Sequence, residues 1–458
     1  MNLQVQTFRT AAPVAALLAI AGTADGAVLT AGPGGTYPTV QAALNAAVAL
    51  PGDDEVRVRE GVYPENLSID LGGLGDLIEL SGGWNSSFTT ASGARNTVID
   101  GGGLGRVFEI LTRGADRLVV HGMQFVNGEA EFRVGVTIDA QDGSSVALYN
   151  LTIRDNVAIA DRASDAGLYA SLSGSADLQV LDCDLLSNTV TSTGTVDARG
   201  GGLSVQLSNT STVSIVGNRI RNNVVSIGPG GFGLGGGADI VQFDPTTTVL
   251  LTDNEFRENR ITASDAFGTG LLLGGGNWML RRNLFANNID DDATAFGAQA
   301  SLSAYGVSGA GIVSDTLVVN GNARGLQLNA GDDSILRANN LTIVGHPSER
   351  GLLANINGTG QLSVYNSISV NNGTNAQLGA GVTEGSNLFV DDPDLFIDPL
   401  VGDYRLATGA AAIDAGDDLP PGGLGPLDFA GEARIFGPAV DIGAYEANDV
   451  MFRDGFEV

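Results

Sequence analysis

Carboxylate and guanidinium side chains recur at matching positions of an internal repeat in the middle of the chain. Stacked strands repeat at about 4.8 Å, so residues at equal positions of successive repeats lie above one another. Acidic and basic groups that converge in this way can transfer protons or bind a polar ligand. The side chains that we predict to converge, called the charged patch below, are Asp184, Arg219, Asp253, Glu255, Arg281 and Arg282.

The same pattern also has a purely structural interpretation. Opposite charges alternate down the columns, as they do in ladders of ion pairs on the outer face of a sheet, where each exposed pair adds at most about 1 kcal/mol. A groove around Asp253 and Arg282 would favour a ligand site, whereas a flat surface would favour the ladder. Both interpretations stay open at this point.

Other reactive groups are sparse. His121 and His346 lie several repeats apart and cannot share a metal ion. The glycine-rich stretch 228–237 lacks the lysine and the helix of a phosphate-binding loop. Cys183 is the single cysteine, so the chain forms no internal disulfide, and a buried apolar role is expected for it. These features favour no nucleophilic, zinc or nucleotide chemistry.

The charge balance excludes several partners. The net charge is −29, from 52 acidic and 23 basic residues, and every basic residue is arginine. Such a surface repels nucleic acid and anionic membranes, because phosphate binding needs clustered positive charge. Acidic runs at 290–292, 332–333 and 391–394 suit calcium chemically, but none has the spacing of a defined calcium loop. We predict no nucleic-acid partner and no cofactor, and leave calcium open.

The element that must position these groups is a tandem repeat. Apolar pairs spaced two residues apart precede each core position, which is strand spacing, and Asn follows most core positions by three residues. Units that recur every 25 to 36 residues bury their apolar faces by stacking, and the Asn side chains would form a ladder. The core positions are Phe125, Ile153, Leu185, Ile220, Phe256, Phe285, Val318, Ile343 and Ser369.

A third strand completes each coil. In several repeats a Gly followed by an apolar residue lies 17 residues before the core position, as at Gly135 and Val136. The constant spacing here, and variable spacing elsewhere, predicts that the long insertions leave from one corner of the coil. Such insertions, at 190–200, 224–235 and 290–304, could shape a groove along the solenoid.

The ends of the chain differ from the repeats. An apolar run after Arg9 with small residues behind it predicts a signal peptide, and Thr39 can cap a short helix over 40–48. The predicted divisions are a signal peptide at 1–26, an N-terminal cap at 27–54, the β-helix at 55–384, a C-terminal cap module at 385–448 and a tail at 449–458.

Two segments carry a resemblance to known families. Residues 39–44 and 61–66 resemble the N-terminal cap of pectin-lyase-like β-helices. The ordered signature near the C-terminus is similar to the ending of choice-of-anchor Q domain proteins, with Ala410-Ala411 in place of a usual Ser-Pro. That signature comprises 403–406, 412–416, Asp428, Gly431, Arg434 and 441–446. The terminal segment 451–458 resembles a short ending found on exported proteins of Gram-negative bacteria.

The resemblance implies a right-handed, three-sheet parallel β-helix that is exported or held on the outer surface of a Gram-negative bacterium. We expect it to bind extended glycans or extracellular matrix without catalysis. The alternatives left open are a polysaccharide lyase or glycoside hydrolase acting on uronate-containing polymers, and a structural adhesin stalk. The anchoring mechanism and the oligomeric state do not follow from the sequence.

Overall fold

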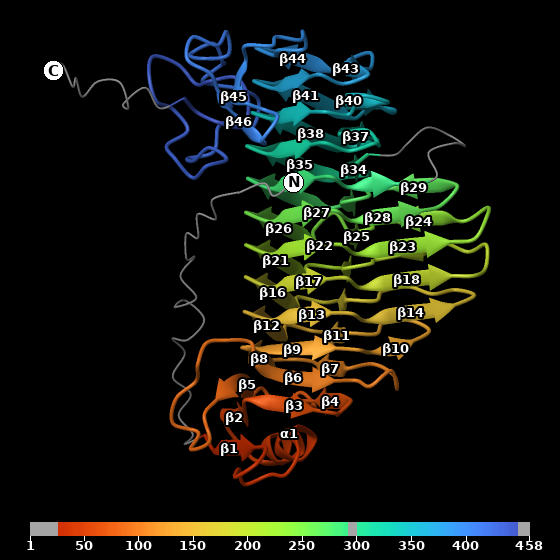
Figure 1. Ribbon diagram of the computed structural model, residues 1–458, viewed down its shortest axis with the longest axis vertical. Helices are drawn as coiled ribbons and strands as arrows, with labels where there is room; N and C mark the ends of the chain where they lie inside the picture. The colour runs from red at the N-terminus through yellow and green to blue at the C-terminus, as the bar shows by residue number, and fades with distance from the viewer. Residues whose placement is uncertain (1–25, 292–299, 448–458) are drawn as a thin grey trace, which may run out of the picture.

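The computed structural model describes residues 26–291 and 300–447 (Figure 1). Residues 1–25 of the expected signal peptide and the expected tail at 449–458 lie outside this range. Within it the chain forms the predicted right-handed, three-sheet parallel β-helix, with one short helix near its start and an irregular C-terminal module. No helix of the described part is long and apolar enough to cross a membrane.

Three long sheets, here sheets A, B and C, run the length of the solenoid. Among the described residues, sheet A has 13 strands and sheets B and C have 11 each, and the neighbouring strands pair in parallel. Sheet A contains β1 (Val28–Ala31), β2 (Asp54–Arg59), β5 (Leu77–Trp84), β8 (Arg117–His121), β12 (Ser145–Tyr149), β16 (Asp177–Leu181), β21 (Thr212–Val216), β26 (Thr248–Thr252), β31 (Asn277–Arg281), β35 (Gly309–Ser314), β38 (Ser334–Asn339), β41 (Gln361–Tyr365) and β44 (Thr383–Gly385).

Sheets B and C follow sheet A in every coil. Sheet B contains β3 (Gly61–Tyr63), β6 (Thr97–Asp100), β9 (Met123–Val126), β13 (Thr152–Arg154), β17 (Asp184–Leu186), β22 (Arg219–Arg221), β27 (Glu255–Arg257), β32 (Leu284–Ala286), β36 (Leu317–Val319), β39 (Thr342–Val344) and β42 (Ile368–Val370). Sheet C contains β4 (Leu67–Asp70), β7 (Phe108–Thr112), β11 (Val136–Ala140), β15 (Leu168–Leu172), β20 (Leu203–Leu207), β25 (Ala238–Gln242), β30 (Leu271–Gly274), β34 (Leu302–Gly306), β37 (Leu326–Ala330), β40 (Arg350–Ile356) and β43 (Thr374–Leu378).

The predicted repeat register is confirmed. Phe125 pairs with Ile153, Ile153 with Leu185, and Leu185 with Ile220, and the same column continues along sheet B. These side chains are fully buried in one continuous core. The core forms because alternate residues of every strand point inward, so each coil covers the apolar face of its neighbours.

The asparagine ladder is confirmed as well. Asn188 Nδ2 donates to Asn223 Oδ1 at 3.0 Å, and Asn223 Nδ2 donates to Asn259 Oδ1 at 3.0 Å. A second ladder, which the sequence analysis did not identify, joins Asn218 to Asn254 at the corner between sheets A and B. The ladder side chains are almost completely buried, so they stabilise the corners and are not offered to a ligand.

The insertions at 190–200 and 224–235 leave from one corner, as predicted, but they are not loops, while most of the insertion at 290–304 lies outside the described residues. With neighbouring segments they form a lateral extension of two stacked sheets, called the fin below (Figure 1). Its own apolar core includes Val190, Val225 and Ile261. The larger fin sheet contains β10 (Glu129–Ala130), β14 (Val157–Ala160), β18 (Thr189–Ser192), β23 (Val224–Ile227), β28 (Arg260–Thr262) and β33 (Ile289–Asp290), and the smaller contains β19 (Ala198–Arg199), β24 (Phe232–Leu234) and β29 (Asp265–Phe267).

Helix α1 (Val40–Ala49) closes the N-terminal end of the core. Thr39 Oγ1 accepts the amide of Ala42 at 3.1 Å, as expected for an N-cap. Glu65 accepts the amides of Val40 and Gln41 at 3.0 and 2.9 Å, which adds a carboxylate at the positive end of the helix. Strand β1 precedes the helix and pairs with β2, so sheet A begins inside the segment that the sequence assigns to the cap.

Candidate functional site

The charged patch lies where sheet A turns into sheet B. Asp184, Arg219 and Glu255 stack on adjacent strands of sheet B, as the register predicts. Asp253 and Arg282 occupy the corner itself in the left-handed backbone conformation, with φ of 59° and 52°. The six predicted side chains therefore share one side of the solenoid.

Each carboxylate of the charged patch forms an ion pair with arginine, whereas the buried Nε of Arg281 has no hydrogen-bond partner in the described structure. Asp184 lies between Arg219 and Arg95, with 2.5 Å from its Oδ2 to Nη1 of Arg95. Arg282 pairs with Asp253, with 2.7 Å from Nε to Oδ1. Glu255 pairs with two arginines of sheet B, Arg221 and Arg257. These contacts match the ladder interpretation, and a ligand-binding role for the charged patch stays a prediction.

The C-terminal module covers the next coils beyond the charged patch. Outward residues of sheet B change there from charged to apolar, at Leu284, Leu317 and Val344, and they pack against Phe396 and Ile442 of the module. The module's two paired strands are β45 (Phe396–Asp398) and β46 (Asp403–Leu406). The apolar change in sheet B is a sequence signal for where this module docks.

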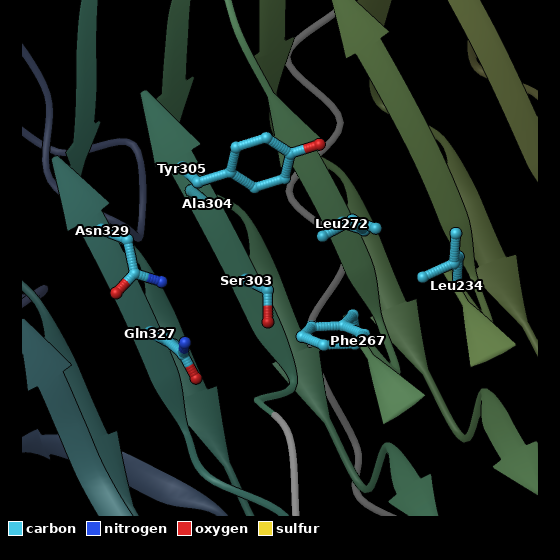
Figure 2. A pocket seen from close by; sticks show the side chains of 8 residues that line it. All are labelled: Leu234, Phe267, Leu272, Ser303, Ala304, Tyr305, Gln327 and Asn329. Atoms are coloured by element: carbon cyan, nitrogen blue, oxygen red, sulfur yellow. The ribbon is translucent and has the colours of Figure 1, made fainter. Parts of the chain in front are cut away.

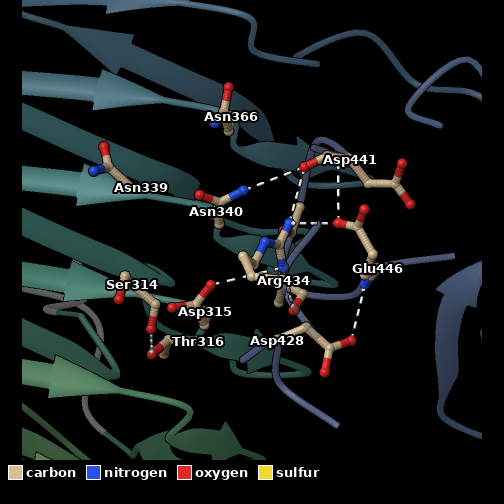
Figure 3. Close-up of polar contacts among 12 residues, drawn as sticks. Ser314, Asp315, Thr316, Asn339, Asn340, Asn366, Asp428, Arg434, Asp441 and Glu446 are labelled. Atoms are coloured by element: carbon tan, nitrogen blue, oxygen red, sulfur yellow. Dashed lines mark hydrogen bonds and ion pairs between the residues drawn. The ribbon is translucent and has the colours of Figure 1, made fainter. Parts of the chain in front are cut away.

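A buried ionic cluster fastens the module to the corner column, and we call it the clamp (Figure 3). Arg434, only 2% exposed, lies 3.6 Å from a carboxylate oxygen of Asp315 and 3.6 Å from one of Glu446. Its Nη1 donates to the carbonyl of Ala444 at 3.0 Å, and its Nη2 donates to that of Asp441 at 2.9 Å. The clamp is built from Asp315, Asp428, Arg434, Asp441 and Glu446.

The C-terminal signature that carries the family resemblance contributes polar residues to the clamp, so these residues have a structural role. Asp428 accepts the amides of Glu432 and Glu446, both at or below 2.9 Å, and Glu446 accepts those of Phe436 and Asp441. Burial raises the pKa of Asp315 to about 6 and that of Glu446 to about 7. Arg281 and Arg282 of the charged patch lie close enough to Asp315 to lower its pKa, so this end of the patch also supports the clamp.

A second buried polar cluster lies where the fin leaves the solenoid, and we call it the fin root. It comprises Asp165, Arg199, Ser204 and Asp239. Asp239 is 1% exposed, and Arg199 Nη1 lies 3.8 Å from its Oδ2. Burial raises the pKa of Asp239 to about 7, and the nearby Asp165 carboxyl adds to that rise while Arg199 opposes it. Within the described residues, Oδ1 of Asp239 has no hydrogen-bond partner, whereas the Ser204 hydroxyl lies close enough to Asp165 to lower its pKa.

Beside the fin root, a cavity of about 280 Å³ opens between the smaller fin sheet and the outer face of sheet C (Figure 2). Two apolar side chains of the fin form one side, and the floor is the outer face of sheet C, where Leu272, Ser303 and Gln327 follow one another on adjacent strands. We call this cavity the fin groove. Its lining is Leu234, Phe267, Leu272, Ser303, Ala304, Tyr305, Gln327 and Asn329.

Tyr305 links the fin groove to the fin root. A Cβ atom on Gly274 would lie 2.2 Å from Cζ of Tyr305, so the ring crosses directly over this glycine on the neighbouring strand. Burial raises the pKa of the Tyr305 phenol, and Asp239 raises it further while Arg199 lowers it. The phenol therefore points from the groove toward the buried Asp239–Arg199 pair.

The fin groove and the fin root are not among the sites predicted from the sequence. The predicted columns of sheet C are the inward ones, whereas Asp239, Ser303 and Gln327 lie in one row of alternate, outward positions. A usable signal was present for two of these residues, because Asp239 follows the insertion at 224–235 and Ser303 lies within that at 290–304. Among the described residues no group of three or more His, Cys, Asp or Glu side chains is arranged to hold a metal ion.

Comparisons with known proteins give a fold-level likeness only. No protein-family model and no curated protein matches the chain. The structure is similar to pectate lyase Pel9A, with a TM-score of 0.44 and 13% identity over 93% of this chain and 98% of that one. It is also similar to the pectin methylesterase from Aspergillus niger, with a TM-score of 0.33 and 14% identity over 83% of this chain and 94% of that one. The fold assignment itself rests on the strand register.

Proposed function

We propose that the protein binds an extended glycan, with one sugar unit seated in the fin groove and the chain running along the outer face of sheet C. Sugar rings present an apolar face and a rim of hydroxyl groups. The fin groove offers both complements, since its lining combines apolar Phe267 and Leu272 with the amides of Gln327 and Asn329.

The observation that carries this proposal is the hydroxyl of Ser303. The residue is 5% exposed and lines the cavity, yet in the described part of the chain its Oγ has no hydrogen-bond partner. A buried hydroxyl without a partner costs about 1–3 kcal/mol, so a ligand that supplies the partner gains that amount on binding.

A binding role without catalysis is favoured over a lyase or hydrolase. Asp165 and Asp239 are two neighbouring carboxyls with raised pKa values, which is a common property of catalytic pairs. However, both side chains are almost fully buried beneath the fin, so neither contacts a ligand in the fin groove. An acid or base must reach the proton that it transfers.

The test is equilibrium binding of the full chain to a glycan array, followed by titration calorimetry with the best ligand. Gln327→Ala should weaken binding by about tenfold, since it removes one or two hydrogen bonds to the sugar. Gln179→Ala, a glutamine on the outer face of sheet A, is the matched control and should leave the affinity unchanged. Equal loss in both variants, or no binding to any glycan, would contradict the proposal.

We further propose that the chain is an exported member of the choice-of-anchor Q group, presented on the outer surface of a Gram-negative cell. The support is the resemblance of the C-terminal signature, whose Asp428, Arg434 and Glu446 also build the clamp. Fractionation of the native producing cells, with the protein followed by antibody, tests the location. Recovery in the cytoplasm would contradict it.

A further inference from the structure

We propose that the fin groove selects neutral sugars and rejects uronates and sulfated glycans. This inference rests on the proposed glycan binding and names its substrate class. It follows from the charges around the fin groove and from the way in which each one is already engaged.

Among the described residues that line the fin groove, the phenol of Tyr305 is the single ionisable group. Hydroxyl, amide and phenol groups, from Ser303, Gln327, Asn329 and Tyr305, make up its polar side. Neutral donors and acceptors of this kind suit sugar hydroxyls, which both donate and accept hydrogen bonds. A carboxylate needs donors only, and preferably charged ones.

The two arginines beside the fin groove are both paired. Arg199 lies next to Leu234 in the smaller fin sheet, and its guanidinium faces the buried Asp239 carboxyl. Arg324 donates to Gln327 Oε1 at 2.9 Å, and its Nε lies 3.4 Å from a carboxylate oxygen of Glu349. If Arg199 turned toward a ligand it would leave the buried Asp239 carboxyl, and if Arg324 turned it would lose its hydrogen bond to Gln327 and its contact with Glu349, which Arg350 also contacts at 3.6 Å.

An anionic sugar would therefore enter the fin groove without a compensating cation. It would lose hydration in the cavity and would approach the Glu349 carboxylate, on a chain whose net charge is −29. Burying an unpaired charge costs several kcal/mol, and like charges add to that cost. A neutral ring meets none of these penalties, so the same hydrogen bonds are available at a lower cost.

Arg324 also fixes the orientation of Gln327. Because Gln327 Oε1 accepts a hydrogen bond from Arg324, the side-chain amide is held in one orientation, and its Nε2 donor points away from Arg324. Ser303 Oγ and Gln327 lie on adjacent strands in register, so both can contact one sugar ring. The arginine acts here as a positioning residue for a neutral donor, and it does not serve as an anion receptor.

The experiment titrates the full-length chain with two matched oligosaccharide series. The neutral series contains gluco-, xylo-, manno- and galacto-oligomers, and the charged series contains oligogalacturonate and oligoalginate of the same lengths. We expect a neutral oligomer to bind at least about tenfold more tightly than any uronate, with little change in affinity between low and high salt.

The outcomes separate the two proposals. If a uronate oligomer binds as tightly as the best neutral one, and Gln327→Ala weakens it, the selectivity is wrong while the glycan-binding function stands. If neither series binds, the proposed function itself fails. If a neutral oligomer binds but Gln327→Ala has no effect, the sugar occupies another surface, and the assignment of the fin groove is overturned.

Discussion

The clamp and the fin root both contain buried ionised or ionisable groups, but these groups are hydrogen-bonded to different extents in the two clusters. In the clamp, the carboxylates of Asp428, Asp441 and Glu446 each accept two backbone amides, and Arg434 donates to three carbonyls. In the fin root, Asp239 has a guanidinium 3.8 Å away, and its Oδ1 is without a partner in the described structure.

The difference is one of degree, because both oxygens of Asp315 and Nε of Arg434 in the clamp also have no hydrogen-bond partner in the described structure. Backbone amides and carbonyls satisfy most of the other clamp groups, and such a network rigidifies the elements that it joins. Within the described chain, Asp239 of the fin root has no backbone hydrogen bond of this kind and lies beside the cavity. We therefore interpret the clamp as the fastening of the C-terminal module, and we propose that the fin root supports the fin groove.

The largest expected effect is in the clamp. Arg434→Met should lower the free energy of unfolding by about 3–5 kcal/mol, because it leaves Asp315 and Glu446 buried without their cation. Thermal unfolding measures this change. Arg405→Met is the matched control, since its side chain is 58% exposed and its pair with Asp403 should contribute less than about 1 kcal/mol. Similar losses in both variants would show that the clamp does not fasten the module.

The fin root should make stability depend on pH in a stated direction. The pKa of Asp239 is raised from 3.8 to about 7 in the folded chain, so between these values the unfolded chain has lost a proton that the folded chain keeps. The free energy of unfolding should then fall as pH rises, by about 1.4 kcal/mol per pH unit, and level off above pH 7.

Asp239→Asn should lower that slope by about 1.4 kcal/mol per pH unit, because the neutral amide has no proton to lose, and should leave the part contributed by Asp315 and Glu446 of the clamp. Denaturant unfolding at a series of pH values gives the slope, with Asp142→Asn on an exposed turn as the control that should retain it. The groups facing Asp239 are Asp165, Arg199 and Tyr305. A wild-type slope in Asp239→Asn would mean that another of these groups, Asp165 foremost, carries the titration.

A smaller effect is expected from Gly274→Ala. The added Cβ would overlap the Tyr305 ring, whose atoms lie 2.2 to 2.5 Å from its position, so the ring must swing away. We expect glycan affinity to fall by about tenfold while the melting temperature changes little, since the ring end is free to move. A fall in both the glycan affinity and the melting temperature would instead show that Gly274 is needed for the stability of the fold.

The smallest effect is expected in the charged patch. Asp253→Asn breaks the pair with Arg282, in which the aspartate side chain is 36% exposed, and should cost less than about 1 kcal/mol of stability. Glycan affinity, measured by calorimetry, should not change. A clear loss of affinity would move the ligand site to the charged patch that the sequence first suggested.

The sequence predicts the fold better than the site, for a physical reason. Inward positions such as Phe125 and Ile153, and the ladder at Asn188, repeat because every coil must satisfy the same packing and hydrogen-bond needs. The fin groove has no such repetition, since Ser303 and Tyr305 occur once and meet Leu234 only through the fin. The contact between sheet C and the fin depends on how the insertions fold. The period of the repeat and the spacing of its residues do not determine that fold.

The clamp shows the opposite case. The order of Asp428, Arg434 and Glu446 is visible in the sequence, but their function is visible only where Arg434 meets Asp315 of the solenoid. The charged patch was predicted as one cluster, and the register places its members together as expected. The sequence alone does not show that each carboxylate of the charged patch already pairs with an arginine.

The most direct test of the central claim, that the fin groove is the ligand site, is hydrogen–deuterium exchange of the full chain with and without a saturating neutral oligosaccharide. We predict that the ligand slows exchange in β24, β29, β34 and β37, which carry the lining of the fin groove. The clamp and the charged patch should not change. Protection centred on β22, β27 and the Asp253 corner, with none at the fin groove, would contradict the account.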